Sequence, residues 1–217
     1  MAKDLAIVLV SGSLNSAVAA AVAAQKYRPV FVYGETVKAD TPTRQRQAYD
    51  ALVAHYRPFR EHAVAMPLLT IQSDKQLAAT ADARSGGALV GALAEAAALV
   101  GAAVPVALAY DAAAIYLGLR VGGQHAELSA ATEFLQIWNE MLQLPIGRSE
   151  LEVAAPLLEL EPWQVVDLGV QVNAPLEKTW SCQESHADPC GACRGCRARE
   201  AAFMQAAKID PLAKKKQ

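Results

Sequence analysis

The first 181 residues contain no cysteine, and the chain carries almost no net charge. A formal charge of -2 offers no electrostatic basis for general nucleic-acid binding. Residues 214–216 are three consecutive lysines, which we interpret as a solvated tail. The start of the chain lacks the basic segment, apolar run and cleavage site of an export signal, so we expect a cytoplasmic protein. The apolar stretch 86–106 is interrupted by Glu95 and glycines, which favours an amphipathic helix over a membrane span.

The chain is long and apolar enough to bury one large core. It has 217 residues, of which 53% are hydrophobic. We expect one large domain over residues 1–175, followed by a small C-terminal part over residues 176–217.

All four cysteines lie within fifteen residues of the C-terminal part: Cys182, Cys190, Cys193 and Cys196. Two overlapping C-x-x-C steps place three sulfurs close together, and Cys182 can fold back as the fourth ligand. Four thiolates at this spacing predict a closed, structural zinc site. The alternatives are two disulfides or four reduced core cysteines, and cytoplasmic location disfavours disulfides. His186 lies inside the loop, and we interpret it as a surface residue rather than a ligand.

A second candidate site follows the first apolar run of the chain. Residues 5–10 are apolar and rich in β-branched side chains, which predicts a buried strand, and an alanine-rich helical segment follows. The turn between them consists of Ser11, Gly12, Ser13, Leu14, Asn15 and Ser16. At such a junction small residues expose backbone N–H groups, and a helix N-terminus favours an anion, so the turn predicts a phosphate site. The alternative is that serine and asparagine simply cap the helix.

Apolar runs and helical patterns alternate along the rest of the chain. We expect further strands at residues 29–33, 61–66, 105–109 and 152–156. We expect helices at residues 41–56, 88–101, 131–144, 162–169 and 197–207, and a loop or lid at residues 70–87. This alternation predicts a doubly wound, mostly parallel sheet.

The chain resembles the 7-cyano-7-deazaguanine synthases of queuosine biosynthesis, the QueC family. The resemblance rests on the loop at residues 11–16, on Tyr33-Gly34, on residues 155–157, on Thr179-Trp180-Ser181-Cys182, and on the cysteine pattern that ends in Cys196-Arg197. It implies an adenine nucleotide α-hydrolase-like fold of the PP-loop type with a zinc-bearing C-terminal part. It also implies ATP-dependent activation of a 7-deazapurine carboxylate as an adenylate, which ammonia converts to an amide and, after a second activation, to a nitrile. A homodimer is expected by the same resemblance.

The chain departs from this family at several positions. The family loop reads Ser-Gly-Gly-x-Asp-Ser, whereas this chain has Ser13 and Asn15. Further departures lie at residues 84–85 and 118–125. Ser13 adds a Cβ where the backbone should approach phosphate, and Asn15 removes a charge that would help to hold Mg²⁺.

Two functions follow from these departures. The first is an ATP-dependent ligase of this family, acting on a deazapurine or another carboxylate, in which Glu35, Asp40 or Asp111 supports the metal instead of Asn15. The second is a catalytically impaired relative that keeps the fold and the zinc and binds a nucleotide or a protein.

Overall fold

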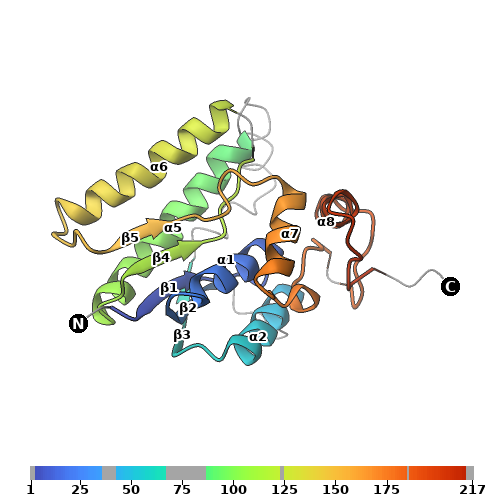
Figure 1. Ribbon diagram of the computed structural model, residues 1–217, viewed down its shortest axis with the longest axis horizontal. Helices are drawn as coiled ribbons and strands as arrows, with labels where there is room; N and C mark the ends of the chain where they lie inside the picture. Colours follow the sequence, from blue (N-terminus) through green and yellow to red (C-terminus); the bar gives the residue numbers. More distant parts are fainter. Residues whose placement is uncertain (1–2, 36–42, 67–86, 123–124, 185, 214–217) are drawn as a thin grey trace.

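Five parallel strands form one sheet at the centre of the molecule (Figure 1). The computed structural model describes residues 3–35, 43–66, 87–122, 125–184 and 186–213. The strand order is β3-β2-β1-β4-β5, and every neighbouring pair is parallel. The strands are β1 (Leu5–Leu9), β2 (Arg28–Glu35), β3 (Arg60–Ala65), β4 (Ala114–Leu117) and β5 (Glu152–Ala154).

Helices cover both faces of this sheet. They are α1 (Leu14–Ala24), α2 (Arg44–Tyr56), α5 (Gly87–Ala109), α6 (His125–Gln143), α7 (Pro162–Gln171) and α8 (Arg194–Gln205), with a 3₁₀ turn η1 (Leu176–Lys178). Figure 1 shows α1 and α2 on one side of the sheet and α5 and α6 on the other, with α8 beyond α7. This arrangement confirms the predicted doubly wound α/β class.

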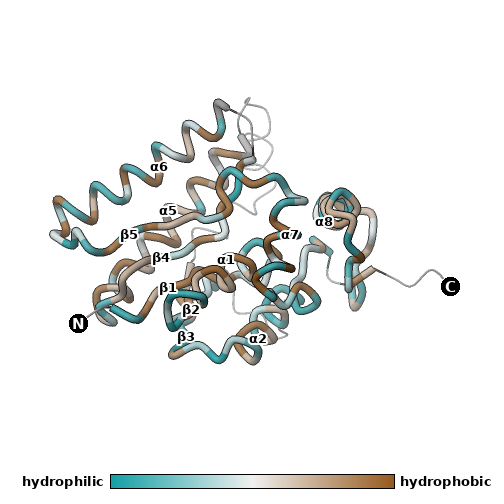
Figure 2. The backbone as a smooth tube through the Cα atoms, viewed as in Figure 1, coloured by the Kyte–Doolittle hydropathy of each residue, from teal (hydrophilic) through white to brown (hydrophobic). Residues whose placement is uncertain are grey.

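The central strand β1 consists of apolar residues, which Figure 2 colours as hydrophobic. Ile7 and Leu9 belong to the cluster that packs against α5 and α6, whereas Val8 packs with residues of α1 and α2. A strand buried on both sides has no polar face, which explains the continuous apolar run in the sequence.

A third apolar cluster joins α1, α7 and α8. Val18 of α1, Val165 of α7 and Phe203 of α8 are each almost fully buried in it. This cluster therefore crosses residue 175, where we placed the boundary between the α/β domain and the C-terminal part. The boundary stays a prediction.

The prediction of a strand at residues 105–109 was wrong. These residues form the last turns of α5, and the fourth strand lies at Ala114–Leu117. The buried residues of α5 recur at the spacing of a helix: Ala96, Val100, Ala103, Val104 and Ala107. A five-residue apolar run does not by itself distinguish a strand from a buried helix. Pro105 instead lies on the exposed side of the helix.

Residues Gly91–Ala109 of α5 are long and apolar enough to cross a membrane, by length and composition only. Core helices of soluble proteins satisfy the same criterion. One side of α5 packs against strands β1, β2 and β4 in the first apolar cluster, and 28% of the Gly91–Ala109 window is buried.

Two helix starts differ from the expected ones. Helix α8 begins at Arg194 because the Cys193 sulfur accepts a hydrogen bond from the Cys196 N–H and so caps the helix. Helix α6 begins at His125, six residues before its expected start. The loop or lid expected at residues 70–87 lies almost wholly outside the described residues, as do Asp40 and residues 84–85.

Replacing Pro105 with alanine tests the helical state of this segment. Proline lacks a backbone N–H and disfavours a helix interior by about 3 kcal/mol relative to alanine. We therefore expect Pro105→Ala to raise the free energy of unfolding by about 1–3 kcal/mol, measured by urea titration. Gly101→Ala is a matched change in the same helix, because its new Cβ would lie 3.6 Å from Trp138 with normal contact. A loss of stability in Pro105→Ala would contradict the helix.

Candidate functional site

The turn after β1 is built around Gly12. Its φ angle is +85°, a left-handed conformation that favours glycine. A Cβ at this position would overlap the Gln45 carbonyl oxygen and would lie 2.9 Å from the Tyr49 nitrogen, both in α2. Only glycine therefore lets the turn pack against α2 and lead into α1.

Three serine hydroxyls of this turn lie together. The Ser11 hydroxyl lies 3.0 Å from that of Ser13 and 3.4 Å from that of Ser16. The Ser13 side chain caps α1 by accepting from the Ser16 N–H at 3.4 Å, and the Ser11 hydroxyl accepts from the Ser13 N–H at 3.4 Å. The Ser11 N–H donates to the Ser16 hydroxyl at 3.2 Å. The expected helix cap is thus present, and the backbone amides of Ser11, Ser13 and Ser16 already have internal acceptors. The amides of Leu14 and Asn15, in the first turn of α1, have no intrahelical acceptor, as in any helix.

The segment that follows β4 lies against the same turn. A Cβ on Gly118 would lie 2.9 Å from the carbonyl carbon of Asn15 and 2.9 Å from the nitrogen of Ser16. Strands β1 and β4 are neighbours whose connections run in opposite directions across the sheet, so this is the topological switch point. The described part of the divergent segment, residues 118–122, therefore borders the candidate phosphate site.

The C-terminal part reaches the turn from the other side. The Trp180 backbone N–H donates to the Gly12 carbonyl oxygen at 2.9 Å. Arg44, in the first turn of α2, donates from Nε to the His186 carbonyl oxygen at 3.2 Å, and its guanidinium lies 5.8 Å from the centre of the Trp180 ring. We had not predicted a role for Arg44 or Trp180, although Trp180 belongs to the Thr-Trp-Ser-Cys segment of the family resemblance.

These segments enclose a cavity of about 1200 Å³. Ser11, Ser13, Leu14 and Asn15 line it, whereas Gly12 and Ser16 are buried behind them. Charged, aromatic and amide-bearing residues from other segments also line the cavity: Tyr33, Glu35, Arg44, Arg46, Asp50, Arg120, Trp180, Gln183, Glu184 and Arg199. A cavity at the switch point is where doubly wound proteins bind ligands.

Of the acids proposed to support Mg²⁺, Glu35 lines the cavity. Its carboxylate lies 3.6 Å from Arg46, which also pairs with Asp50 at 2.9 Å. The proposal for Asp111 was wrong. Asp111 precedes β4 and pairs with Lys3 at 2.9 Å. It therefore lies at the amino ends of the strands, whereas the cavity lies at their carboxyl ends. The reason is the misplaced fourth strand: a strand ending at residue 109 would have put Asp111 at its carboxyl end.

The four cysteine sulfurs form a compact cluster. All four lie within 4.8 Å of one another, and the pairs Cys190–Cys196 and Cys182–Cys193 are 3.9 Å apart. Four sulfurs around one zinc ion at about 2.3 Å would be about 3.8 Å apart. The cysteines are free rather than paired in disulfides, so the cluster fits a metal ion. His186 is exposed and contributes its backbone carbonyl to Arg44 rather than a ring nitrogen to the cluster.

Backbone amides surround these sulfurs. The Gln183 and Cys196 N–H groups donate to Cys193 at 3.5 and 3.4 Å, and together they lower the pKa of this thiol to about 6. Burial raises the pKa of Cys196 to about 12. Gly195 is required here because a Cβ would overlap the Ser181 carbonyl oxygen. This contact presses the start of α8 against the segment that carries Trp180.

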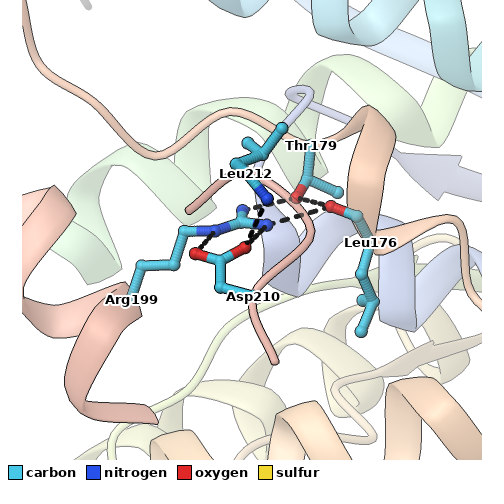
Figure 3. A network of polar contacts seen from close by, with 5 residues as sticks. All are labelled: Leu176, Thr179, Arg199, Asp210 and Leu212. Atoms are coloured by element: carbon cyan, nitrogen blue, oxygen red, sulfur yellow. Dashed lines mark hydrogen bonds and ion pairs between the residues drawn. The ribbon is translucent and has the colours of Figure 1, made fainter. Parts of the chain in front are cut away.

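The buried guanidinium of Arg199 contacts the residues just before Trp180 (Figure 3). Arg199 of α8 pairs with Asp210 through two nitrogens, at 2.8 and 2.9 Å. It also donates to the Thr179 hydroxyl at 2.7 Å and to the Leu176 carbonyl oxygen at 3.0 Å. The side chains of Arg199 and Asp210 are only 6% and 13% exposed. These contacts hold residues 176–179 in place, and Trp180 is the next residue in the chain.

The sheet, the glycine turn, the cavity at the switch point and the cysteine cluster beside it define a doubly wound α/β protein with a candidate ligand site and a four-cysteine cluster that could hold a metal ion. The family described as Queuosine biosynthesis protein QueC matches residues 5–207. The chain belongs to this family.

Known proteins resemble the chain over most of its length. The 7-cyano-7-deazaguanine synthase of Acidobacterium capsulatum is 26% identical and covers 97% of this chain and 96% of its own. That of Parasynechococcus marenigrum is 27% identical and covers 97% of both chains. Among solved structures, the NMN synthetase from Francisella tularensis is 15% identical with a TM-score of 0.47, covering 96% of this chain and 79% of its own.

The Arg199–Asp210 pair generates a prediction about stability. Removing one partner of a buried pair leaves an uncompensated charge, which costs about 3–5 kcal/mol. We expect Arg199→Met to lower the free energy of unfolding by that amount in urea titrations. Lys208→Met is the control, because Lys208 and Asp167 lie 4.0 Å apart and are more exposed, and such pairs contribute at most about 1 kcal/mol. Equal effects of the two substitutions would contradict this role of Arg199.

Proposed function

We propose that the chain is an ATP-dependent ligase that activates 7-carboxy-7-deazaguanine for conversion by ammonia to the nitrile. The observation that carries the proposal is the family match over residues 5–207, which spans both the turn after β1 and the cysteine cluster. Full-length relatives are 7-cyano-7-deazaguanine synthases. We also propose a cytoplasmic location and a homodimer.

The cavity offers what adenylate formation requires. A carboxylate oxygen of the substrate attacks the α-phosphorus of ATP, the bond to the bridging oxygen breaks, and pyrophosphate leaves. The amides of Leu14 and Asn15 at the N-terminus of α1 would bind the departing pyrophosphate. Mg²⁺ would neutralise phosphate charge, with Glu35 as its protein carboxylate, because Glu35 lines the cavity at the carboxyl end of β2.

The second candidate function is a catalytically impaired relative. It is favoured by the serine hydroxyls in the turn. The Ser13 hydroxyl accepts from the Ser16 N–H, so a phosphate at this position would have to displace an internal hydrogen bond. A glycine at position 13 would leave that amide to the ligand, and an aspartate at position 15 would restore a carboxylate for Mg²⁺.

The two functions differ in their response to changes in the turn. We expect the unmodified chain to catalyse the reaction slowly, with measurable release of pyrophosphate from ATP in the presence of ammonia and 7-carboxy-7-deazaguanine. Loss of one such contact typically costs about 10²-fold in rate, so we expect Ser13→Gly with Asn15→Asp to raise turnover by about 10²-fold. No pyrophosphate release by the unmodified chain would favour the impaired relative. Leu14→Ile, which keeps the backbone amides, is the control. Ordinary family-level turnover by the unmodified chain would show that Ser13 and Asn15 do not impair catalysis.

For the cysteine cluster we propose zinc in a structural role. Four thiolates complete a tetrahedral shell and leave no position for a substrate or water. Such a metal supplies folding energy to a segment with few apolar contacts of its own.

Elemental analysis of purified protein is expected to find about one zinc per chain, with X-ray absorption giving metal–sulfur distances of about 2.3 Å. Cys193→Ser should weaken zinc retention and expose the C-terminal part to proteolysis, because one of the four ligands is lost. Cys193→Ser is compared with Ser181→Ala, which removes no ligand. Iron with acid-labile sulfide, or two disulfides in freshly purified protein, would refute the zinc assignment.

A further inference from the structure

Four arginine side chains line the cavity, but they are not equally available to a ligand. Arg199 is paired with Asp210, and Arg46 is paired with Glu35 and Asp50. The other two arginines donate to neutral groups: Arg120 to the Leu160 carbonyl oxygen at 3.4 Å, and Arg44 to the His186 carbonyl oxygen and the Gln47 side-chain oxygen. Of these two, Arg44 is the one that lies beside an aromatic ring in the described part of the chain, that of Trp180.

Arg44 lies beside an aromatic ring whose position is fixed. The Trp180 backbone is held by its hydrogen bond to Gly12 and by the Arg199 network directly before it in sequence. Trp180 lines the cavity together with the turn at residues 11–16. The Arg44 guanidinium lies 5.8 Å from the centre of the Trp180 ring. A flat apolar surface and a cation whose hydrogen bonds to described residues all go to neutral groups thus lie together beside this turn.

The side chains that follow Trp180 complete this corner. Gln183 and Glu184 line the same cavity, and they offer an amide group and a carboxylate. A carboxylate accepts two N–H groups from a planar, amine-bearing heterocycle, and an amide both donates and accepts. A guanidinium binds a carboxylate through two parallel hydrogen bonds, and indole rings stack on flat heterocycles.

We propose that Arg44 and Trp180 form the subsite for the acid substrate, a planar heteroaromatic carboxylate. The ring of the substrate stacks on Trp180, and its carboxylate binds Arg44, which directs the reacting oxygen toward the turn at residues 11–16. Gln183 and Glu184 bind the edge of the heterocycle. This assignment rests on the proposed function, since it names the residues that would hold the acid of that reaction.

Calorimetric titration without ATP tests the subsite separately from catalysis. The two probes are 7-carboxy-7-deazaguanine and 7-deazaguanine, which differ by the carboxylate alone. Hydrogen bonds to charged groups correspond to affinity changes of about tenfold or more, so the unmodified chain should prefer the acid by that factor. Arg44→Gln should abolish the preference, and Arg44→Lys should retain part of it. Trp180→Leu should weaken both probes about tenfold and leave their ratio unchanged, because stacking does not depend on the carboxylate.

Arg197→Gln is the matched control, because Arg197 is exposed on α8 and does not line the cavity. It should bind both probes as the unmodified chain does. An unchanged preference in Arg44→Gln, or no binding of the acid to the unmodified chain, would overturn the subsite. Circular dichroism and urea midpoints of the variants separate loss of binding from loss of fold. Acid-dependent exchange of pyrophosphate into ATP, measured with the Ser13→Gly, Asn15→Asp variant, reports on the ligase alone: binding of the acid without exchange in this variant would retain the subsite and refute the proposed reaction.

Discussion

The buried guanidinium of Arg199 is the interaction on which the site depends. A charge that is removed from water must be paired, and only Asp210, beyond the end of α8, pairs with it in the described chain. The chain after α8 must therefore fold back, and the same guanidinium then holds Thr179 and Leu176. This places Trp180 where its N–H reaches Gly12. The Arg199–Asp210 pair thus helps to set the geometry of the cavity, although no step of the proposed reaction uses it.

The turn after β1 has two competing uses for the same atoms. Its glycine and its position at the N-terminus of α1 suit an anion, while its serine hydroxyls satisfy part of the backbone internally. A hydroxyl that caps a helix stabilises the ligand-free chain, and a phosphate must exceed that contribution before it binds. Substitutions that stabilise the free turn therefore weaken its ligand complex, even when the fold does not change.

Local patterns predicted much of the fold. The apolar run of β1, the capped start of α1 and the cysteine spacing each depend on residues close in sequence, and the structure confirms the strand, the helix and a compact sulfur cluster. The prediction for residues 105–109 was wrong because their apolar pattern fits both a helix and a strand. Only the length of the helix that contains them, α5, distinguishes the two. The contacts of Arg44 with His186 and of Arg199 with Asp210 could not be predicted, since they depend on how distant segments meet.

The hydrogen bond between Trp180 and Gly12 joins an early turn to a late one. During synthesis β1 and its turn leave the ribosome long before residues 176–210 exist. The helices around the central strands can pack in that interval, but the wall formed by Trp180 and the cysteine cluster is missing. The cavity therefore cannot reach its final shape before residues 176–210 have been synthesised, whatever the order in which the rest of the chain folds.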